Sequence, residues 1–176
     1  MIKNKRFYKR GFSLLELVVT IPIMLIALVL VFSIGDFGNK YFKKTNIQMD
    51  NQQGVRLIGD YIKKDIRNAN VISTDEAIVK AQNVNVNYYA LKYSGNHLVK
   101  QVKKQSDGTL VSQTTIGGIL TDLTFLTVTD KGMLKYRVSS NTNGQNYNVV
   151  YEVVLDNISK IVLPSSNATI IYYAKN

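Results

Sequence analysis

The chain has 176 residues, no cysteine and a formal net charge of +10. Five of the positive charges lie within residues 1–11, so the remaining side chains carry +5, too little for a dedicated nucleic-acid binder. Without cysteine no disulfide can form, which fits export from a Gram-positive cell. Beyond one apolar segment, roughly 100–140 residues remain, enough for one domain with its own core.

A basic leader precedes that apolar segment. The leader, residues 1–11, has no acidic residue, and its basic residues are Lys3, Lys5, Arg6, Lys9 and Arg10. From Leu14 to Ile34 the only ionisable residue is Glu16, and a helix of this length crosses a hydrocarbon core of roughly 30 Å. The positive-inside rule places the N-terminus in the cytoplasm and the rest of the chain outside. A secretory signal peptide is the alternative, but its apolar region is shorter, about 7–15 residues, and an A-x-A-like site follows it.

The start of the apolar segment resembles a known family. Residues 11–19, Gly-Phe-Ser-Leu-Leu-Glu-Leu-Val-Val, resemble the N-terminal signature of type IV pilins and type II secretion pseudopilins. The resemblance implies that a prepilin peptidase cuts between Gly11 and Phe12 and N-methylates Phe12, and that Glu16 is the family's acid. It also implies further partners: other pilins in a filament, a pilus assembly platform protein and the membrane. An ordinary signal anchor with an incidental glutamate is the alternative.

Glu16 needs a partner, because an unpaired charge inside an apolar segment is costly. Cleavage after Gly11 leaves a free amine on Phe12. In a bundle of such helices, Glu16 of one chain can meet the Phe12 amine of its neighbour, which neutralises both charges and sets the axial register. The carboxylate also suits the positive N-terminal end of the helix dipole. The alternative is an interfacial side chain that reaches the headgroups.

Pro22 departs from the family pattern, in which many major pilins carry a proline further along, where this chain has Ser33. A proline lacks the N–H and disturbs the helical bond back to Val18. One interpretation is a kink, or a short melted stretch, when the helix packs into a filament. The other is a proline that a membrane helix tolerates.

After the apolar segment, Gly35 and Gly38 predict either a flexible joint or simply the membrane boundary. Residues 40–70 are predicted to be helical, with Gly54 and Gly59 allowing close packing. One apolar stripe at spacings of three and four residues should pack on a sheet; it consists of Val55, Ile58, Ile62, Ile66 and Ala69.

From about residue 77 the apolar period becomes two, which predicts strands. The candidates are 77–81, 84–93, 97–105, 110–115, 119–129, 133–139, 147–155 and 169–173. Turns are predicted at 94–96, 106–108, 130–132 and 141–144, the first and third as tight hairpins.

The predicted fold class is α+β: a long N-terminal helix packed on an antiparallel β-sheet domain. The predicted organisation is a cleaved leader (1–11), a membrane or filament-core helix (12–35) and an extracellular domain (36–176). Within the pilin family, residues 61–69 and 118–125 resemble J-type pseudopilins and W-type minor pilins.

The sequence predicts no enzyme, cofactor or metal. His97 is expected on a surface or a strand. Asp75 and Glu76 could be half of a calcium site, but a Ca²⁺ shell takes about 6–8 oxygens, so a solvated loop is the expectation. The basic cluster on one predicted strand consists of Lys100, Lys103 and Lys104. Because side chains alternate along a strand, Lys100 and Lys104 should share one face and Lys103 should point to the other. The cluster predicts either weak contact with DNA or another anion, or an edge strand that lysines protect from unwanted pairing.

The function predicted from these features is that of a minor type IV pilin or pseudopilin, a structural subunit of a pilus tip or initiation complex. An adhesive or DNA-binding competence tip pilin is the alternative. The expected location is the cell membrane, crossed once with the N-terminus in the cytoplasm, and then the extracellular pilus.

Overall fold

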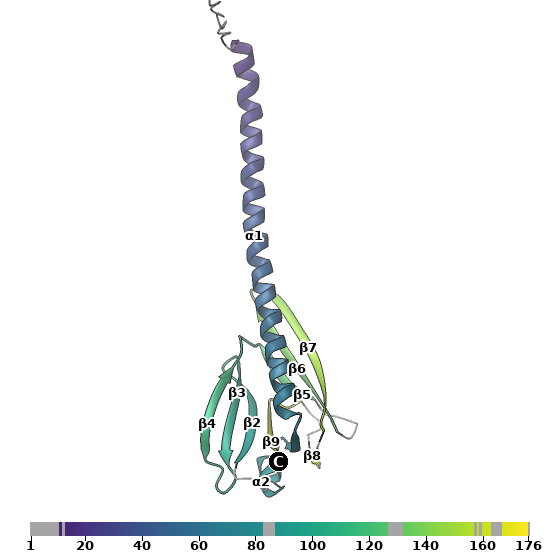
Figure 1. Ribbon diagram of the computed structural model, residues 1–176. Helices are drawn as coiled ribbons and strands as arrows, with labels where there is room; N and C mark the ends of the chain where they lie inside the picture. The colour runs from purple at the N-terminus through teal and green to yellow at the C-terminus, as the bar shows by residue number, and fades with distance from the viewer. Residues whose placement is uncertain are drawn as a thin grey trace, which may run out of the picture. The chain divides into compact units, whose positions relative to one another are not determined.

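The computed structural model describes residues 11, 13–82, 87–126, 132–156, 158, 160–162 and 167–175. Its contacts divide the chain into two compact units, residues 1–44 and 45–176. The first helix, α1 (Leu14–Ile66), contributes to both units (Figure 1). The other elements are β1 (Ala69–Ser73), α2 (Glu76–Gln82), β2 (Asn87–Ser94), β3 (His97–Lys104), β4 (Leu110–Ile116), β5 (Asp122–Leu126), β6 (Met133–Thr142), β7 (Gln145–Val154), β8 (Lys160–Val162) and β9 (Ile170–Lys175).

The helix α1 starts with a cap. Ser13 precedes its first residue, and the Ser13 hydroxyl accepts a hydrogen bond from the Leu15 amide at 3.2 Å. This side chain thereby satisfies one of the amides that the first turn of a helix leaves without an intrahelical partner. Farther along, α1 continues through Gly35 and Gly38, so the structure shows no joint at these glycines, and the membrane boundary stays a prediction.

The second unit contains two sheets. The larger has the strand order β4-β3-β2-β9-β1-β8, and the smaller has the order β5-β6-β7. Every pairing is antiparallel except that of β1 with β8, which is parallel. The predicted α+β class is confirmed, and the parallel pair makes the larger sheet mixed. Figure 1 shows the smaller sheet alongside the C-terminal part of α1.

The core forms where the predicted stripe of α1 meets the sheets. Val55, Ile58, Ile62 and Ile66 are fully buried, and they cluster with side chains from both sheets, among them Leu91, Phe125 and Tyr136. Fully burying an isoleucine side chain contributes about 1.5–3 kcal/mol, so these few positions hold the helix on the sheets. Ala69 is also buried, but it belongs to β1.

Gly59 allows the close packing that its position predicts. A Cβ atom there would lie 2.1 Å from a ring carbon of Tyr151. The Tyr136 hydroxyl donates a hydrogen bond of 2.6 Å to the Gly59 carbonyl oxygen, and the rings of Tyr136 and Tyr151 stack with centroids 5.3 Å apart. The smaller sheet therefore approaches the backbone of α1 directly.

Three parts of the predicted secondary structure need correction. Residues 77–81 were predicted as a strand but form α2. A short alternating apolar run fits either structure. Here the Asp75 side chain caps a helix by accepting a hydrogen bond from the Ala77 amide at 2.9 Å. The predicted helix end at 70 is wrong, since β1 begins at Ala69. The strands β1 and β8 were not predicted.

The strands at 97–105 and 110–115 are confirmed as β3 and β4. Those at 84–93, 119–129, 133–139, 147–155 and 169–173 correspond to β2, β5, β6, β7 and β9 with shifted ends, and residues 83–86 and 127–131 lie outside the described part. The hairpin at 94–96 is confirmed, with Gly95 and Asn96 at φ 59° and 64°. In the turn between β6 and β7, Asn143 and Gly144 have φ 51° and 76°, the left-handed conformation that a two-residue hairpin loop requires. The predicted hairpin at 130–132 falls largely outside the described residues.

Candidate functional site

The N-terminal part of α1 is the first candidate site. It holds one acid, Glu16, in its first turn, and its apolar side chains are exposed: Leu14 to 83% and Phe32 to 74%. One helix in the described part of the chain is long and apolar enough to cross a membrane, and it is α1. So much exposed apolar surface marks an interaction site or a lipid contact rather than a water-facing helix.

The two hydroxyl side chains within the apolar segment donate to nearby backbone carbonyl groups. The Ser33 hydroxyl donates to the Val29 carbonyl oxygen at 2.7 Å, and the Thr20 hydroxyl donates to the Leu17 carbonyl oxygen at 3.3 Å. Such internal bonds are what a helix in lipid requires, because no water is present to accept them. Pro22 lies inside α1, which is helical on both sides of it. The predicted melting on assembly concerns a filament and stays a prediction.

The predicted processing residues lie at the very start of the described part. Gly11 is exposed, with open space around its Cα, and Phe12 lies outside the described residues. Glu16 is exposed and occupies the third position of α1, where Ser13 and Glu16 make the S-x-x-E pattern of a helix start. This pattern gives Glu16 a local position at the helix start besides its predicted role in assembly, a position that the S-x-x-E spacing in the sequence could have indicated.

Lys100 is the first residue of the predicted basic cluster, and it faces α1. Its ammonium group lies 2.9 Å from the carboxylate of Asp65, which also accepts hydrogen bonds from Lys175 at 2.6 Å and from the hydroxyl of Tyr173. The same ammonium group lies 4.9 Å from the ring centre of Tyr89, within the range of a cation–π contact. Asp65 thus joins the last turn of α1 to β3 and β9.

Asp65 ionises readily in this setting. Burial opposes its ionisation, but the hydrogen bonds from Lys100, Lys175 and Tyr173 outweigh burial and hold the pKa of Asp65 below its usual value. Burial likewise opposes the charge on Lys100, and the bond to Asp65 outweighs it, so the pKa of Lys100 is raised. The pKa of the Tyr173 hydroxyl is raised by burial and by the neighbouring carboxylate. Asp65 and Lys100 therefore stay charged, and Tyr173 stays neutral, across the physiological pH range.

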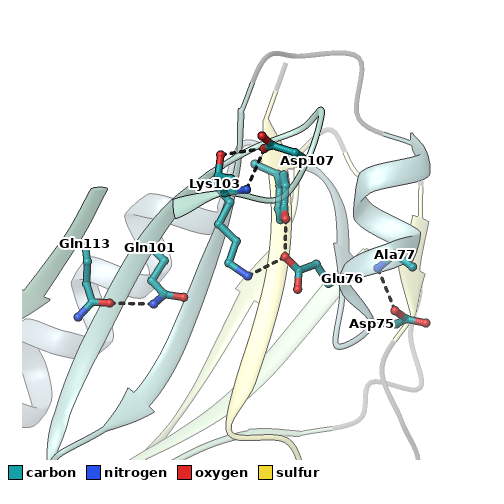
Figure 2. Close-up of polar contacts among 9 residues, drawn as sticks. Asp75, Glu76, Ala77, Gln101, Lys103, Asp107 and Gln113 are labelled. Atoms are coloured by element: carbon teal, nitrogen blue, oxygen red, sulfur yellow. Dashed lines mark hydrogen bonds and ion pairs between the residues drawn. The ribbon is translucent and has the colours of Figure 1, made fainter. Parts of the chain in front are cut away.

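Lys103 points to the other face of the sheet, toward α2, as the strand alternation predicts. Its ammonium group lies 2.7 Å from Glu76, which also accepts a hydrogen bond from the Tyr88 hydroxyl (Figure 2). Burial raises the pKa of Glu76, but the bonds from Lys103 and Tyr88 outweigh it and lower the pKa. The burial of Tyr88 and its bond to Glu76 raise the pKa of the Tyr88 hydroxyl.

These contacts change the interpretation of the basic cluster. Lys100 and Lys103 have side chains only 18% exposed and are paired with Asp65 and Glu76, while Lys104 is exposed. The edge-strand interpretation is wrong, because β3 lies between β4 and β2. Sequence reasoning missed Asp65 as the partner of Lys100, since 35 residues separate them and no local pattern links them.

The remaining predicted polar positions have structural roles. Asp75 caps α2, and Glu76 belongs to the ion pair with Lys103, so neither lies in a solvated loop free of contacts. His97 opens β3 opposite Ser94 of the hairpin. Within the described ranges, no group of three or more His, Cys, Asp or Glu side chains is placed to hold a metal ion.

Comparison of the chain with protein-family models, with curated proteins and with solved structures found no match. The family resemblance of the N-terminal segment therefore depends on the sequence and on the arrangement of α1 and its sheet domain.

Proposed function

We propose that this protein is a minor type IV pilin or pseudopilin, a structural subunit that is processed by a prepilin peptidase and assembled into a pilus or pseudopilus. One observation carries the proposal. Gly11-Phe12 lies just before an exposed apolar segment of α1, and Glu16 lies in the first turn of that segment. The later part of the same helix packs in the core of a β-sheet domain. Each part alone occurs in many proteins, and the combination is what the pilin architecture requires.

In this proposal the peptidase cuts between Gly11 and Phe12 on the cytoplasmic side and methylates the new amine. The apolar segment stays in the membrane until assembly, and the sheet domain lies outside. Glu16 then pairs with the Phe12 amine of a neighbouring subunit, because a charge carried into an apolar helix bundle must be neutralised. The platform protein and the other pilins are the partners of this step.

Two substitutions test the proposal when the chain is co-expressed with its own peptidase and filament proteins. A Gly11→Ala variant should remain unprocessed, which is seen as a larger chain on gels and as the uncut N-terminus in mass spectrometry. A Glu16→Gln variant keeps the size of the side chain but loses the charge, so it should be processed and then be strongly depleted from sheared filaments. Normal cleavage of the first, or normal incorporation of the second, would refute the corresponding role.

The alternative of a DNA-binding or adhesive tip pilin has weaker support. Two of the three lysines that motivated it, Lys100 and Lys103, are paired with acids of the same chain. Only the exposed Lys104 of that cluster is oriented to meet a large anion. Filter retention of the full chain on DNA at low salt, compared with a Lys104→Gln variant, tests this alternative directly.

A further inference from the structure

A ring of aromatic and basic side chains surrounds α1 just after the apolar segment ends. We call it the collar; it consists of Phe37, Lys40, Tyr41, Phe42, Lys43 and Lys44. Its three aromatic side chains are 62–70% exposed. At about 3.6 residues per turn, the three aromatic residues fall on one half of the helix surface and the three lysines on the other.

The collar is ill suited to water alone. Phe37 and Phe42 are both 70% exposed, and the Phe37 ring stacks on the Tyr41 ring with centroids 6.2 Å apart. Lys40 pairs with Asp36 at 2.7 Å, one helical turn away. Aromatic rings beside lysines are typical of the membrane–water interface, where rings lie at headgroup level and ammonium groups reach anionic lipid phosphates.

The position of the collar along α1 fits that interface. A helix rises about 1.5 Å per residue, so Phe37 lies roughly 35 Å along the axis from Leu14, and Lys44 roughly 45 Å. A hydrocarbon core is about 30 Å thick, and the whole bilayer with its headgroups is about 40–45 Å thick. With Leu14 at the cytoplasmic boundary of the hydrocarbon core, an upright helix would carry Phe37 about 5 Å and Lys44 about 15 Å past the outer hydrocarbon boundary. A tilt within the usual range of about 0–40° shortens this span and brings the lysines to the outer headgroups.

We propose that the collar binds anionic phospholipid headgroups of the outer leaflet and thereby fixes the depth of α1 in the membrane. The occupant follows from charge complementarity: three lysines lie within five residues, directly after a segment whose exposed side chains suit hydrocarbon, and Asp36 compensates one of them, Lys40. The inference rests on the proposed function in one respect, that α1 crosses the membrane from inside to outside.

Leader cleavage gives the collar a further role. Before cleavage, basic residues flank the apolar segment at both ends, five in the leader and three in the collar. Cleavage after Gly11 removes the five, and between Phe12 and Lys44 the basic side chains that remain are those of the collar. The mature helix then carries one positive charge at its inner end, the Phe12 amine, and the three lysines of the collar at its outer end, so most of its attraction to lipid charge lies at the end toward which a filament would draw it.

The experiment uses the full chain in liposomes. Because the chain has no cysteine, an Asn39→Cys substitution carries one environment-sensitive fluorophore beside the collar. The liposomes contain phosphatidylcholine with or without phosphatidylglycerol, and a lipid with a nitroxide in its headgroup quenches the fluorophore. We expect quenching to be several-fold stronger with phosphatidylglycerol than without it, because each lysine near an anionic surface is attracted to it.

The chain offers a matched control pair of lysines. A Lys43→Gln/Lys44→Gln variant should lose most of the phosphatidylglycerol-dependent quenching. A Lys63→Gln/Lys64→Gln variant removes the same charge from an exposed pair farther along α1 and should keep the quenching. Equal behaviour of the two variants would overturn the proposal.

Two other outcomes are also decisive. If quenching depends on the protein-to-lipid ratio and not on phosphatidylglycerol, the collar contacts another copy of the chain. This outcome overturns lipid binding but leaves the pilin proposal intact. Resistance of the apolar segment to alkaline extraction reports insertion separately. A chain that fails to insert overturns both proposals, whereas normal incorporation of Glu16→Gln into filaments would refute the assembly role of Glu16 and leave the collar proposal in place.

Discussion

Gly59→Ala is expected to destabilise the protein, although the same exchange stabilises an ordinary helix. In a helix interior alanine is favoured over glycine by about 1 kcal/mol. Here the new Cβ atom would lie 2.1, 2.4 and 2.6 Å from three ring carbons of Tyr151, whereas carbon atoms pack at about 3.5–4.0 Å. The ring would have to move by more than an ångström.

The Tyr151 ring is held on two sides, which sets the size of the expected loss in the free energy of unfolding. It stacks on Tyr136 with an interplanar angle of 12°, and its hydroxyl donates to the Val55 carbonyl oxygen at 3.3 Å. Overpacking a filled core costs about 1–3 kcal/mol, and a lost aromatic pair costs about 0.5–1.5 kcal/mol. After subtraction of the helix preference, we expect a net loss of about 1–3 kcal/mol in the free energy of unfolding.

Gly54→Ala is the matched control on the same helix. A Cβ atom there meets only the Gly118 Cα at 3.9 Å, an ordinary contact, so this variant should gain up to about 1 kcal/mol. Urea unfolding of the full chain in detergent, followed by near-UV circular dichroism of the tyrosines, measures both. In a Tyr151→Ala background the cost of Gly59→Ala should disappear. If Gly59→Ala stabilises the wild-type chain as much as Gly54→Ala does, the packing argument is refuted.

Three further predictions concern the sheet domain. Asp65→Asn removes the carboxylate that two lysines share and should lower the free energy of unfolding by about 3 kcal/mol. Folding lowers the pKa of Asp65, so the stabilisation from its carboxylate is present above about pH 4 and is lost as the pH falls further. In the Asp65→Asn variant the free energy of unfolding should therefore fall less steeply below about pH 4 than in the wild-type chain. Glu76→Gln should cost about 1–3 kcal/mol by weakening the bond to Lys103, measured in the same urea assay. Gly144→Ala should cost about 1 kcal/mol because φ is 76° there, whereas Gly35→Ala, in a region of open space, should not lower stability.

The parts of the fold that sequence predicted are those with a local signature. The buried stripe of α1 repeats every three or four residues, and the hairpins carry Gly95-Asn96 and Asn143-Gly144, which tolerate the left-handed backbone. The strand β8 has no such signature. It has three residues and pairs in parallel with β1, with Val71 opposite Lys160, a partner so far along the chain that no local pattern could announce it.

The same reasoning applies to the polar contacts. Alternation along β3 correctly placed Lys100 and Lys103 on opposite faces of the sheet. It could not supply their partners, because Asp65 and Glu76 are brought to them by the packing of α1 and α2 on the sheet. Charge counted from sequence alone therefore overstated how much of this strand is available to an external anion.

The helix α1 is built from two segments that need different surroundings. All of its buried side chains lie from Asn51 onward, where a single stripe faces the core of the second unit. The segment from Leu14 to Ile34 has no buried residue and is almost entirely apolar, which suits lipid or neighbouring helices. Because the core of the second unit includes no side chain of that segment, the proposed exchange of lipid for neighbouring helices would leave the core contacts unchanged. A subunit that must leave a membrane without unfolding requires this separation.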